Sequence, residues 1–345
     1  HNNPFIPSDG KKNDLMIFYR KVGDSNQLFS IDLKTHKIDQ LTNKSWVRGE
    51  IVGKMNHKVY YQCRDSVFET GIENHATRLI YVFPDSIRGS ITTLNADETF
   101  LSGAIITREE SEIFRKFPRK GDFFRRVFEA KQRRSLFTLE AESGLFKTVY
   151  SEKAWLNHIQ FSPTDPELLM YCHEGPWHEV DRIWTTNIYN VHPKLMHKRA
   201  VNREIAGHEF FSPDGKKIWY DLQIPRGETF FLASVDVRTN EHEKYQLTRN
   251  EWSIHFNISP DQKLFAGDGG DSSQVAHAKN GMWIYLFKLD GDSLRSEKLV
   301  NMKHHDYDLE PNVHFSPDGK WIIFRANFEG HSDIYAVEIA KYESK

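Results

Sequence analysis

Cysteine is nearly absent from this chain, which has two in 345 residues. Cys63 and Cys172 lie far apart in the sequence, which argues against a disulfide framework and against a thiolate metal cluster. Long apolar runs are also missing: no stretch approaches the roughly 20 apolar residues that cross a bilayer, so we predict no membrane span. The net charge of -2 gives no overall attraction to nucleic acid, which is therefore not expected as a partner.

The start of the chain leaves its compartment open. The chain begins at His1 rather than Met, and no charged and then apolar segment precedes its first motif. Removal of a leader peptide gives such a start, so the sequence leaves both the cytoplasm and the periplasm open as the compartment.

Nothing in the sequence indicates an obligate protein partner. With 39% hydrophobic residues, the chain has enough apolar side chains for a large core.

What is present is a repeated hairpin, an alternating strand followed by a Ser-Pro-Asp turn and a second strand. Four clear copies are HIQFSPTDPELLMYC from His158, HEFFSPDGKKIWYDL from His208, HFNISPDQKLFAGDG from His255 and VHFSPDGKWIIFRAN from Val313. Three weaker copies lie near Pro4, Met55 and Thr92. Most copies are followed by a second alternating pair, as in LFSIDLKTHKIDQLT.

Four short strands repeated seven times predict an all-β fold, a seven-bladed β-propeller that forms a single domain over residues 1–345. A β-sandwich has fewer strands and no fixed period. The last blade has no room for a fourth strand after YAVEI, so we expect a closing strand from sequence that precedes His1.

A basic insertion interrupts the third repeat at about residues 104–137. Its segment REESEIFRKFPRKGDFFRRVFEAKQRR holds ten Lys or Arg against five Asp or Glu. We expect a short helix there, over one mouth of the ring. Two interpretations stay open: a solvated surface insertion, and an electropositive, aromatic-rich lid over an anionic ligand.

Histidines recur at the first strand of four repeats: His158, His208, His255 and His314. Because the first strand of each blade lines the channel of a propeller, we expect these imidazoles to converge. Imidazole with carboxylate and amide donors suits Mn, Fe, Zn or Cu, and HHDYDLEPNVHF supplies such donors.

The segment CHEGPWHEVDRIW, from Cys172 to Trp184, is expected to form the loop between the second and third strands of blade four. The planar guanidinium of Arg182 is suited to two parallel hydrogen bonds to a carboxylate, and the indole ring of Trp177 is suited to stacking on a sugar ring. In the alternative interpretation, Glu174, Asp181 and Arg182 pair with one another and the tryptophans pack between blades. Arg226 is a second arginine that we predict to bind a carboxylate.

The segments CHEGPWHEVDRIW, GHEFFSPDG, HFNISPDQKLFAGDGGD and EPNVHFSPDGKWIIFRANFEG resemble the oligogalacturonate lyase family, propeller enzymes that degrade pectin fragments. The likeness runs from about Trp155 to Ile339 and, more faintly, through the start of the chain and the insertion. It implies β-elimination at a 4-linked uronic acid, with manganese as the divalent metal and an acidic oligosaccharide as the substrate.

The resemblance also implies roles for individual residues. The catalytic residues are His208 as the base and Arg182, which binds the substrate carboxylate. Apart from the resemblance, we predict His173, Trp177 and Arg226 as substrate-binding residues. The metal ligand before the blade-six turn is His255. Where the family has a Gln and two His before its last hairpin, this chain has Tyr307, Glu310 and Asn312. We predict that the metal shell is completed by a substitute set, namely His305, Glu310, Asn312 and His314.

This departure suggests a substrate other than plain oligogalacturonate, such as a uronate-containing oligosaccharide of rhamnogalacturonan. Two alternatives to a lyase stay open. One is a glycoside hydrolase that uses a pair of carboxylates such as Glu174 and Asp181. The other is a propeller without catalytic activity that binds a glycan or a protein through its rim.

Overall fold

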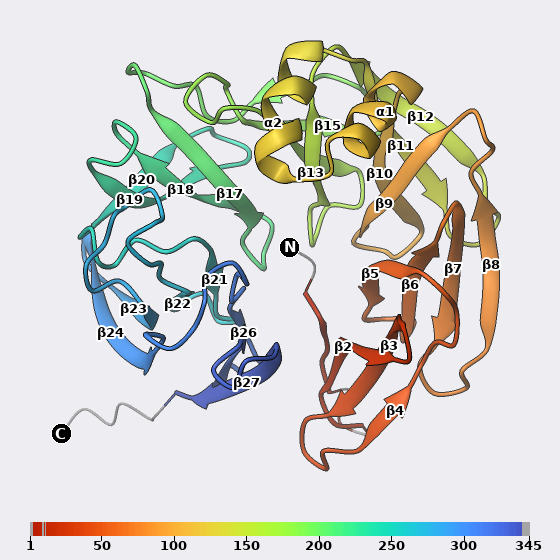
Figure 1. Ribbon diagram of the computed structural model, residues 1–345, viewed down its shortest axis with the longest axis horizontal. Helices are drawn as coiled ribbons and strands as arrows, with labels where there is room; N and C mark the ends of the chain where they lie inside the picture. Colours follow the sequence, from red (N-terminus) through yellow and green to blue (C-terminus); the bar gives the residue numbers. More distant parts are fainter. Residues whose placement is uncertain (1–2, 9, 11, 340–345) are drawn as a thin grey trace. The chain divides into compact units, whose positions relative to one another are not determined.

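The computed structural model describes residues 3–8, 10 and 12–339. The chain divides into two compact units, the first made of residues 1–176 and 182–195 and the second of residues 177–181 and 196–345. Every sheet in both units is a meander whose successive strands pair antiparallel (Figure 1). The single-domain organisation stays a prediction.

The first unit contains four sheets of four strands. Sheet by sheet, these strands are β1 (Phe5–Ile6), β2 (Leu15–Val22), β3 (Ser25–Asp32) and β4 (Ile38–Gln40); β5 (Val47–Gly53), β6 (Lys58–Cys63), β7 (Ser66–Gly71) and β8 (Thr77–Val82); β9 (Arg88–Leu94), β10 (Phe100–Ile106), β11 (Arg134–Glu140) and β12 (Phe146–Glu152); β13 (Leu156–Phe161), β14 (Leu168–His173), β15 (Ile183–Asn187) and β16 (Lys194–Leu195).

The second unit contains three sheets. Their strands are β17 (Ile205–Phe211), β18 (Lys217–Gln223), β19 (Phe230–Asp236) and β20 (His242–Leu247); β21 (Phe256–Ile258), β22 (Leu264–Gly267), β23 (Trp283–Asp290) and β24 (Ser293–Asn301); β25 (His314–Phe315), β26 (Trp321–Ala326) and β27 (Asp333–Glu338). Within the described residues the last sheet has three strands, as expected from the short last repeat. The seven sheets are the blades of the predicted seven-bladed β-propeller.

The Ser-Pro-Asp turns fold for the same local reason in each clear repeat of the second unit. In blade five the Ser212 hydroxyl donates to Asp214 (2.6 Å) and accepts from the Lys217 N–H (3.0 Å). Gly215 supplies the left-handed φ of 69° that closes the turn. Ser259 with Asp261, and Ser316 with Asp318, repeat the hydroxyl-to-carboxylate bond at 2.7 Å and 2.6 Å. The predicted hairpins are therefore present at these turns.

A β-bulge that contains a left-handed residue occurs in the first strand of three blades. In each, two residues of the first strand lie opposite one residue of the second: Gly49 and Glu50 in β5, His158 and Ile159 in β13, and His208 and Glu209 in β17. The first residue of every pair has a left-handed backbone, with φ of 65°, 47° and 51° respectively. Such a bulge re-aims the side chain that it carries. In blades four and five that side chain is an imidazole.

The basic insertion folds as two helices rather than the single helix expected. They are α1 (Arg108–Lys116) and α2 (Lys120–Ala130), between β10 and β11 (Figure 1). Thr107 caps α1 by accepting from the Glu110 N–H, and Pro118 follows the last turn of α1 and prevents the two helices from merging.

Aromatic side chains of the insertion pack against one another and against Trp155, directly before β13. The rings of Phe114 and Phe123 lie 4.9 Å apart, and Phe124 lies 5.1 Å from the ring of Trp155. The aromatic content of the insertion is thus used for anchoring the helices, and the lid interpretation stays a prediction.

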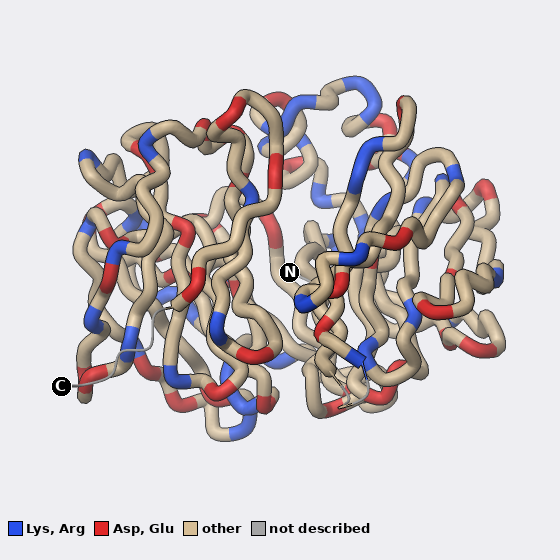
Figure 2. The backbone as a smooth tube through the Cα atoms, turned by 90° about the horizontal axis from the view of Figure 1, so that it is seen from below, with Lys and Arg blue, Asp and Glu red and all other residues tan. Residues whose placement is uncertain are grey.

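Apart from the locally basic insertion, charges of both signs are mixed over the fold. Figure 2 shows Lys and Arg interspersed with Asp and Glu along both units, in agreement with the formal net charge of -2. Neither described helix has the length and apolar character needed to cross a membrane.

Candidate functional site

Two imidazoles meet in the second unit. His208 lies in the bulge of β17, and His255 directly precedes β21. Their ring centroids are 4.6 Å apart, and the indole of Trp177 meets His208 edge-on at 4.8 Å. Gly207 makes room for that indole, since a Cβ there would lie 3.1 Å from the Trp177 ring. The structure thus brings together three residues that the sequence nominated.

A buried carboxylate orients His255. Asp268, which follows β22 and is fully buried, accepts from the His255 backbone N–H and from its Nδ1, each at 2.8 Å. The Asn312 N–H donates to the same carboxylate at 3.2 Å. Because Nδ1 carries the proton in this arrangement, Nε2 keeps its lone pair for a metal or a substrate.

Oxygen donors lie beside that lone pair. The Glu310 carboxylate is 3.7 Å from His255 Nε2 and is half-exposed. The Asn312 side chain donates to the Glu310 carbonyl at 3.0 Å, while its buried Oδ1 accepts no hydrogen bond from the described residues. A buried carbonyl oxygen without a donor, next to an imidazole and a carboxylate, fits a divalent cation of the Mn²⁺ type.

His314 begins β25, two residues after Asn312. Shielding from water is the main cause that lowers the pKa of His314 to about 3. Its ring is therefore neutral at physiological pH, which is the form that binds metals.

His305 is less suited to a metal. Its Nε2 donates to the Leu309 carbonyl at 2.8 Å, and its Nδ1 accepts from the Asn327 N–H at 3.3 Å. Both ring nitrogens are thus used by the backbone, and His305 supports the segment before β25. Tyr307, at a family ligand position, instead donates its hydroxyl to the Asp268 carbonyl at 3.0 Å.

Arg182 and Glu174 form a buried ion pair in the first unit. Arg182 NH1 donates to Glu174 Oε1 at 2.8 Å, and the side chains are 0% and 6% exposed. Burial alone would raise the pKa of Glu174, but the charge of Arg182 and the nearby His158 hold it well below its usual range. Glu174 is therefore a carboxylate at neutral pH and is unsuited to act as a general acid, which counts against the hydrolase alternative.

His173 and Arg226 lie in different settings. Because side chains alternate along a strand, His173 and Cys172 point to opposite faces of β14. His173 stacks on Trp184 at 4.8 Å and contacts Glu152 at 3.0 Å, so it does not join Glu174. Arg226 is exposed in the loop between β18 and β19.

Asp181 is paired as well. In the second unit its carboxylate accepts from Arg199 Nε at 3.1 Å and from the Arg199 N–H at 3.2 Å. The interpretation that the acidic residues of CHEGPWHEVDRIW serve local ion pairs is thus correct for Glu174 with Arg182, while Asp181 uses a different arginine.

Asp268 was not singled out from the sequence. The sequence holds a signal for it: His255 directly precedes the first strand of the SPDQ hairpin and Asp268 directly follows the second. The register of the hairpin therefore places the two residues opposite each other.

The chain is similar throughout its length to proteins of one kind. The sequence profile of the family described as oligogalacturonate lyase matches residues 7–342. The oligogalacturonate lyase of Dickeya dadantii (strain 3937) is 24% identical over 364 residues, which cover 98% of this chain and 90% of the relative.

Two solved structures have the same fold. An oligogalacturonate lyase in complex with manganese superposes with a TM-score of 0.82 at 22% identity, covering 95% of this chain and 86% of the other. An oligogalacturonate lyase from Vibrio parahaemolyticus superposes with a TM-score of 0.84 at 22% identity, covering 99% of this chain and 91% of the other.

Proposed function

Since the chain belongs to the oligogalacturonate lyase family, a family of carbon–oxygen lyases, we propose that it cleaves 4-linked uronic acids in acidic oligosaccharides by β-elimination. In this reaction a base takes the proton from C5. The electron pair of that bond forms the C4=C5 double bond, the bond from C4 to the glycosidic oxygen breaks, and the leaving oxygen is protonated. The product is a 4,5-unsaturated sugar.

We assign the base to His208. The observation that supports this assignment is the close pair of His208 and His255, in which Asp268 orients one ring while the bulge of β17 aims the other. Imidazole is the side chain whose ordinary pKa lies nearest neutrality, so it accepts a proton without needing strong perturbation.

The C5 proton is too weakly acidic to be removed while the neighbouring carboxylate keeps its full charge. A divalent cation such as Mn²⁺, when bound, would neutralise that carboxylate and acidify C5. His255 Nε2, the Glu310 carboxylate and Asn312 Oδ1 are the donors that would hold it, with His314 as a further neutral imidazole. His305 supports these residues through the backbone.

Arg182 is proposed to favour binding of the substrate carboxylate, as its place in the family motif implies. Its guanidinium is shared with Glu174, which fixes the orientation of the group. Trp177, half-buried beside His208, is proposed to contact the sugar ring. The Glu310 and Asn312 positions differ from the family pattern, so we propose a uronate-containing oligosaccharide related to oligogalacturonate as the preferred substrate.

The test is the chemical nature of the product. The protein is incubated with oligogalacturonate and with rhamnogalacturonan fragments, with Mn²⁺ or with EDTA. Rising ultraviolet absorbance and two product fragments whose combined mass equals that of the substrate support the lyase. Fragments whose combined mass exceeds the substrate by one water indicate a hydrolase, and no cleavage of any uronate overturns the proposal. EDTA is expected to abolish the reaction.

A further inference from the structure

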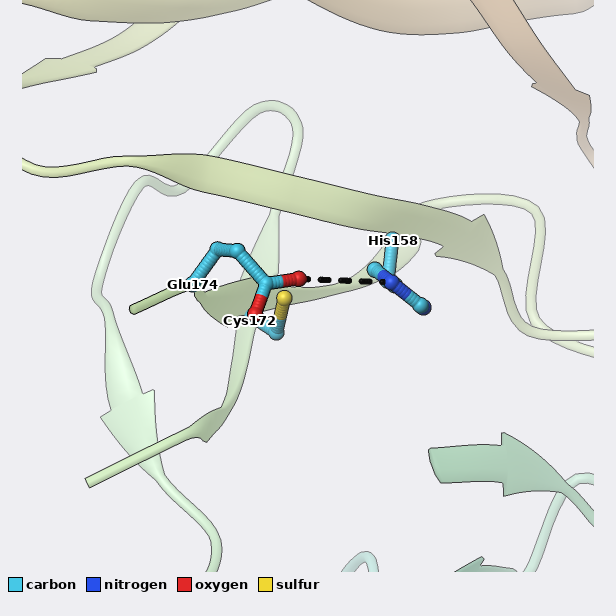
Figure 3. Close-up of side chains that lie close together, drawn as sticks. All are labelled: His158, Cys172 and Glu174. Atoms are coloured by element: carbon cyan, nitrogen blue, oxygen red, sulfur yellow. Dashed lines mark ion pairs between the residues drawn. The ribbon is translucent and has the colours of Figure 1, made fainter. Parts of the chain in front are cut away.

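A second cluster of metal-type donors lies in blade four. His158 from the bulge of β13, Cys172 from β14 and Glu174 directly after β14 each place one donor atom within 4.8 Å of the others. Figure 3 shows the Cys172 sulfur and the Glu174 carboxylate facing the same ring of His158. We propose that these three residues form a binding site for a thiophilic divalent cation of the Zn²⁺ class. The inference does not rest on the proposed lyase activity.

The donor types select the cation. One imidazole nitrogen, one thiolate and one carboxylate oxygen are all common ligands of zinc, at about 2.0–2.3 Å. A thiolate favours Zn²⁺ over Mn²⁺, which prefers oxygen donors, so this site and the His255 donors differ in the metal they take. Three protein ligands leave a fourth position of the tetrahedron for water.

The charge balance allows a cation despite the neighbouring arginine. Glu174 accepts a hydrogen bond from the buried Arg182 guanidinium, which favours the carboxylate form. Arg182 binds Oε1 at 2.8 Å, whereas Oε2 faces His158 Nε2 at 3.5 Å. Arg182 would then support a metal-bound carboxylate through its other oxygen. When the Cys172 thiol releases its proton to solvent on binding, thiolate and carboxylate leave one net positive charge shared by the metal and Arg182.

The backbone of His158 is strained. Its φ of 47° is left-handed, a conformation that costs about 1–3 kcal/mol for a residue other than glycine. The equivalent bulge in blade two uses Gly49, which has no such cost. The strained imidazole in blade five is His208, the proposed base. Blades four and five thus each hold an imidazole at the same bulge position.

Access to the cluster is through the imidazole. The side chain of His158 is 26% exposed, whereas Glu174 is 6% exposed and Cys172 is fully buried. A cation from solvent therefore meets the ring of His158 first and then the two buried donors.

The experiment titrates the metal-free protein with Co²⁺, which takes zinc sites and reports a thiolate ligand through a sulfur-to-metal charge-transfer band in the near ultraviolet. The full chain is expected to give this band with one Co²⁺, and Zn²⁺ is expected to remove it. Cys172→Ser is expected to abolish the band, while Cys63→Ser, which replaces the chain's other cysteine, is expected to retain it.

Two results overturn the inference: a folded wild-type protein that gives no thiolate band, or a band that survives Cys172→Ser. His158→Asn keeps a residue that tolerates the left-handed backbone and is expected to weaken Co²⁺ binding at least tenfold; unchanged affinity also contradicts the site. These readouts involve no uronate, so failure of the site and failure of the lyase assay are recognised separately.

Discussion

Replacing Asp268 by Asn is the perturbation whose effect follows most directly from the geometry. The carboxylate accepts three hydrogen bonds, two from His255 at 2.8 Å and one from the Asn312 N–H at 3.2 Å. An amide has a single oxygen. If that oxygen takes the Oδ1 place, the NH₂ group faces His255 Nδ1 and shifts the ring proton to Nε2, and the Asn312 N–H loses its acceptor. If the oxygen takes the Oδ2 place, the His255 backbone N–H loses its acceptor.

Either orientation has a calculable cost. A buried N–H that loses its acceptor costs about 1–3 kcal/mol, so Asp268→Asn is expected to lower the free energy of unfolding by that amount. Loss of a carboxylate that orients a metal-binding histidine typically lowers metal affinity by about 10–100-fold. We expect the Kd for Mn²⁺ to rise by a factor in this range.

Calorimetric titration with Mn²⁺ and urea denaturation measure the two effects. Asp271→Asn is the matched control, because Asp271 caps its own turn by accepting from the Ser273 N–H at 2.8 Å. The control is expected to bind Mn²⁺ like the wild type. Wild-type affinity and stability in Asp268→Asn would refute the argument that this carboxylate positions His255.

Three further outcomes are expected. Glu110→Gln leaves the buried guanidinium of Arg134 without its carboxylate and is expected to lower stability by about 3–5 kcal/mol in urea denaturation. Burial raises the pKa of Asp221 from 3.8 to about 7, so the folded state keeps the Asp221 proton to a higher pH than the unfolded state. The free energy of unfolding therefore contains a contribution that is present at low pH and is lost as the pH rises through about 7. Asp221→Asn is expected to remove this pH-dependent loss of stability. Gly207→Ala pushes a methyl group against Trp177 and is expected to change its fluorescence and raise KM.

Each of these outcomes has a control. Glu112→Gln removes the exposed pair with Arg115 and is expected to leave stability unchanged, unlike Glu110→Gln. An Asp221→Asn protein with the wild-type pH dependence of stability contradicts the assigned proton. Gly121→Ala adds a methyl group in α2 where nothing lies within 4 Å, and it is expected to leave Trp177 fluorescence and KM unchanged.

The strand pattern could be predicted because the residues that close each turn lie within a few positions of one another in the sequence. Ser212, Asp214 and Gly215 close their turn by hydrogen bonds and backbone preference within a few residues, and such causes are visible in the sequence. The same holds for the loop between β14 and β15, whose bounds agree with the predicted position of CHEGPWHEVDRIW.

The site was predicted less completely, because side-chain direction depends on register and on bulges. His173 adjoins Cys172 in sequence, yet the alternation of β14 turns it to the other face. His305 has the right chemistry for a ligand, but both of its nitrogens are used by the backbone. Asp268 was missed because its importance comes from a partner across a hairpin. The convergence of Arg182 with His208 stays a prediction.

The most direct test of the central claim compares turnover of His208→Asn with that of His277→Asn at equal Mn²⁺ occupancy. Both positions have a left-handed backbone, with φ of 51° and 47°, and His277 is exposed in a loop. Loss of a general base costs about 10²–10⁴-fold, so kcat for formation of the unsaturated product should fall by that factor in His208→Asn and stay at the wild-type value in His277→Asn. A His208→Asn protein that binds Mn²⁺ normally and retains wild-type kcat would contradict the assignment of the base.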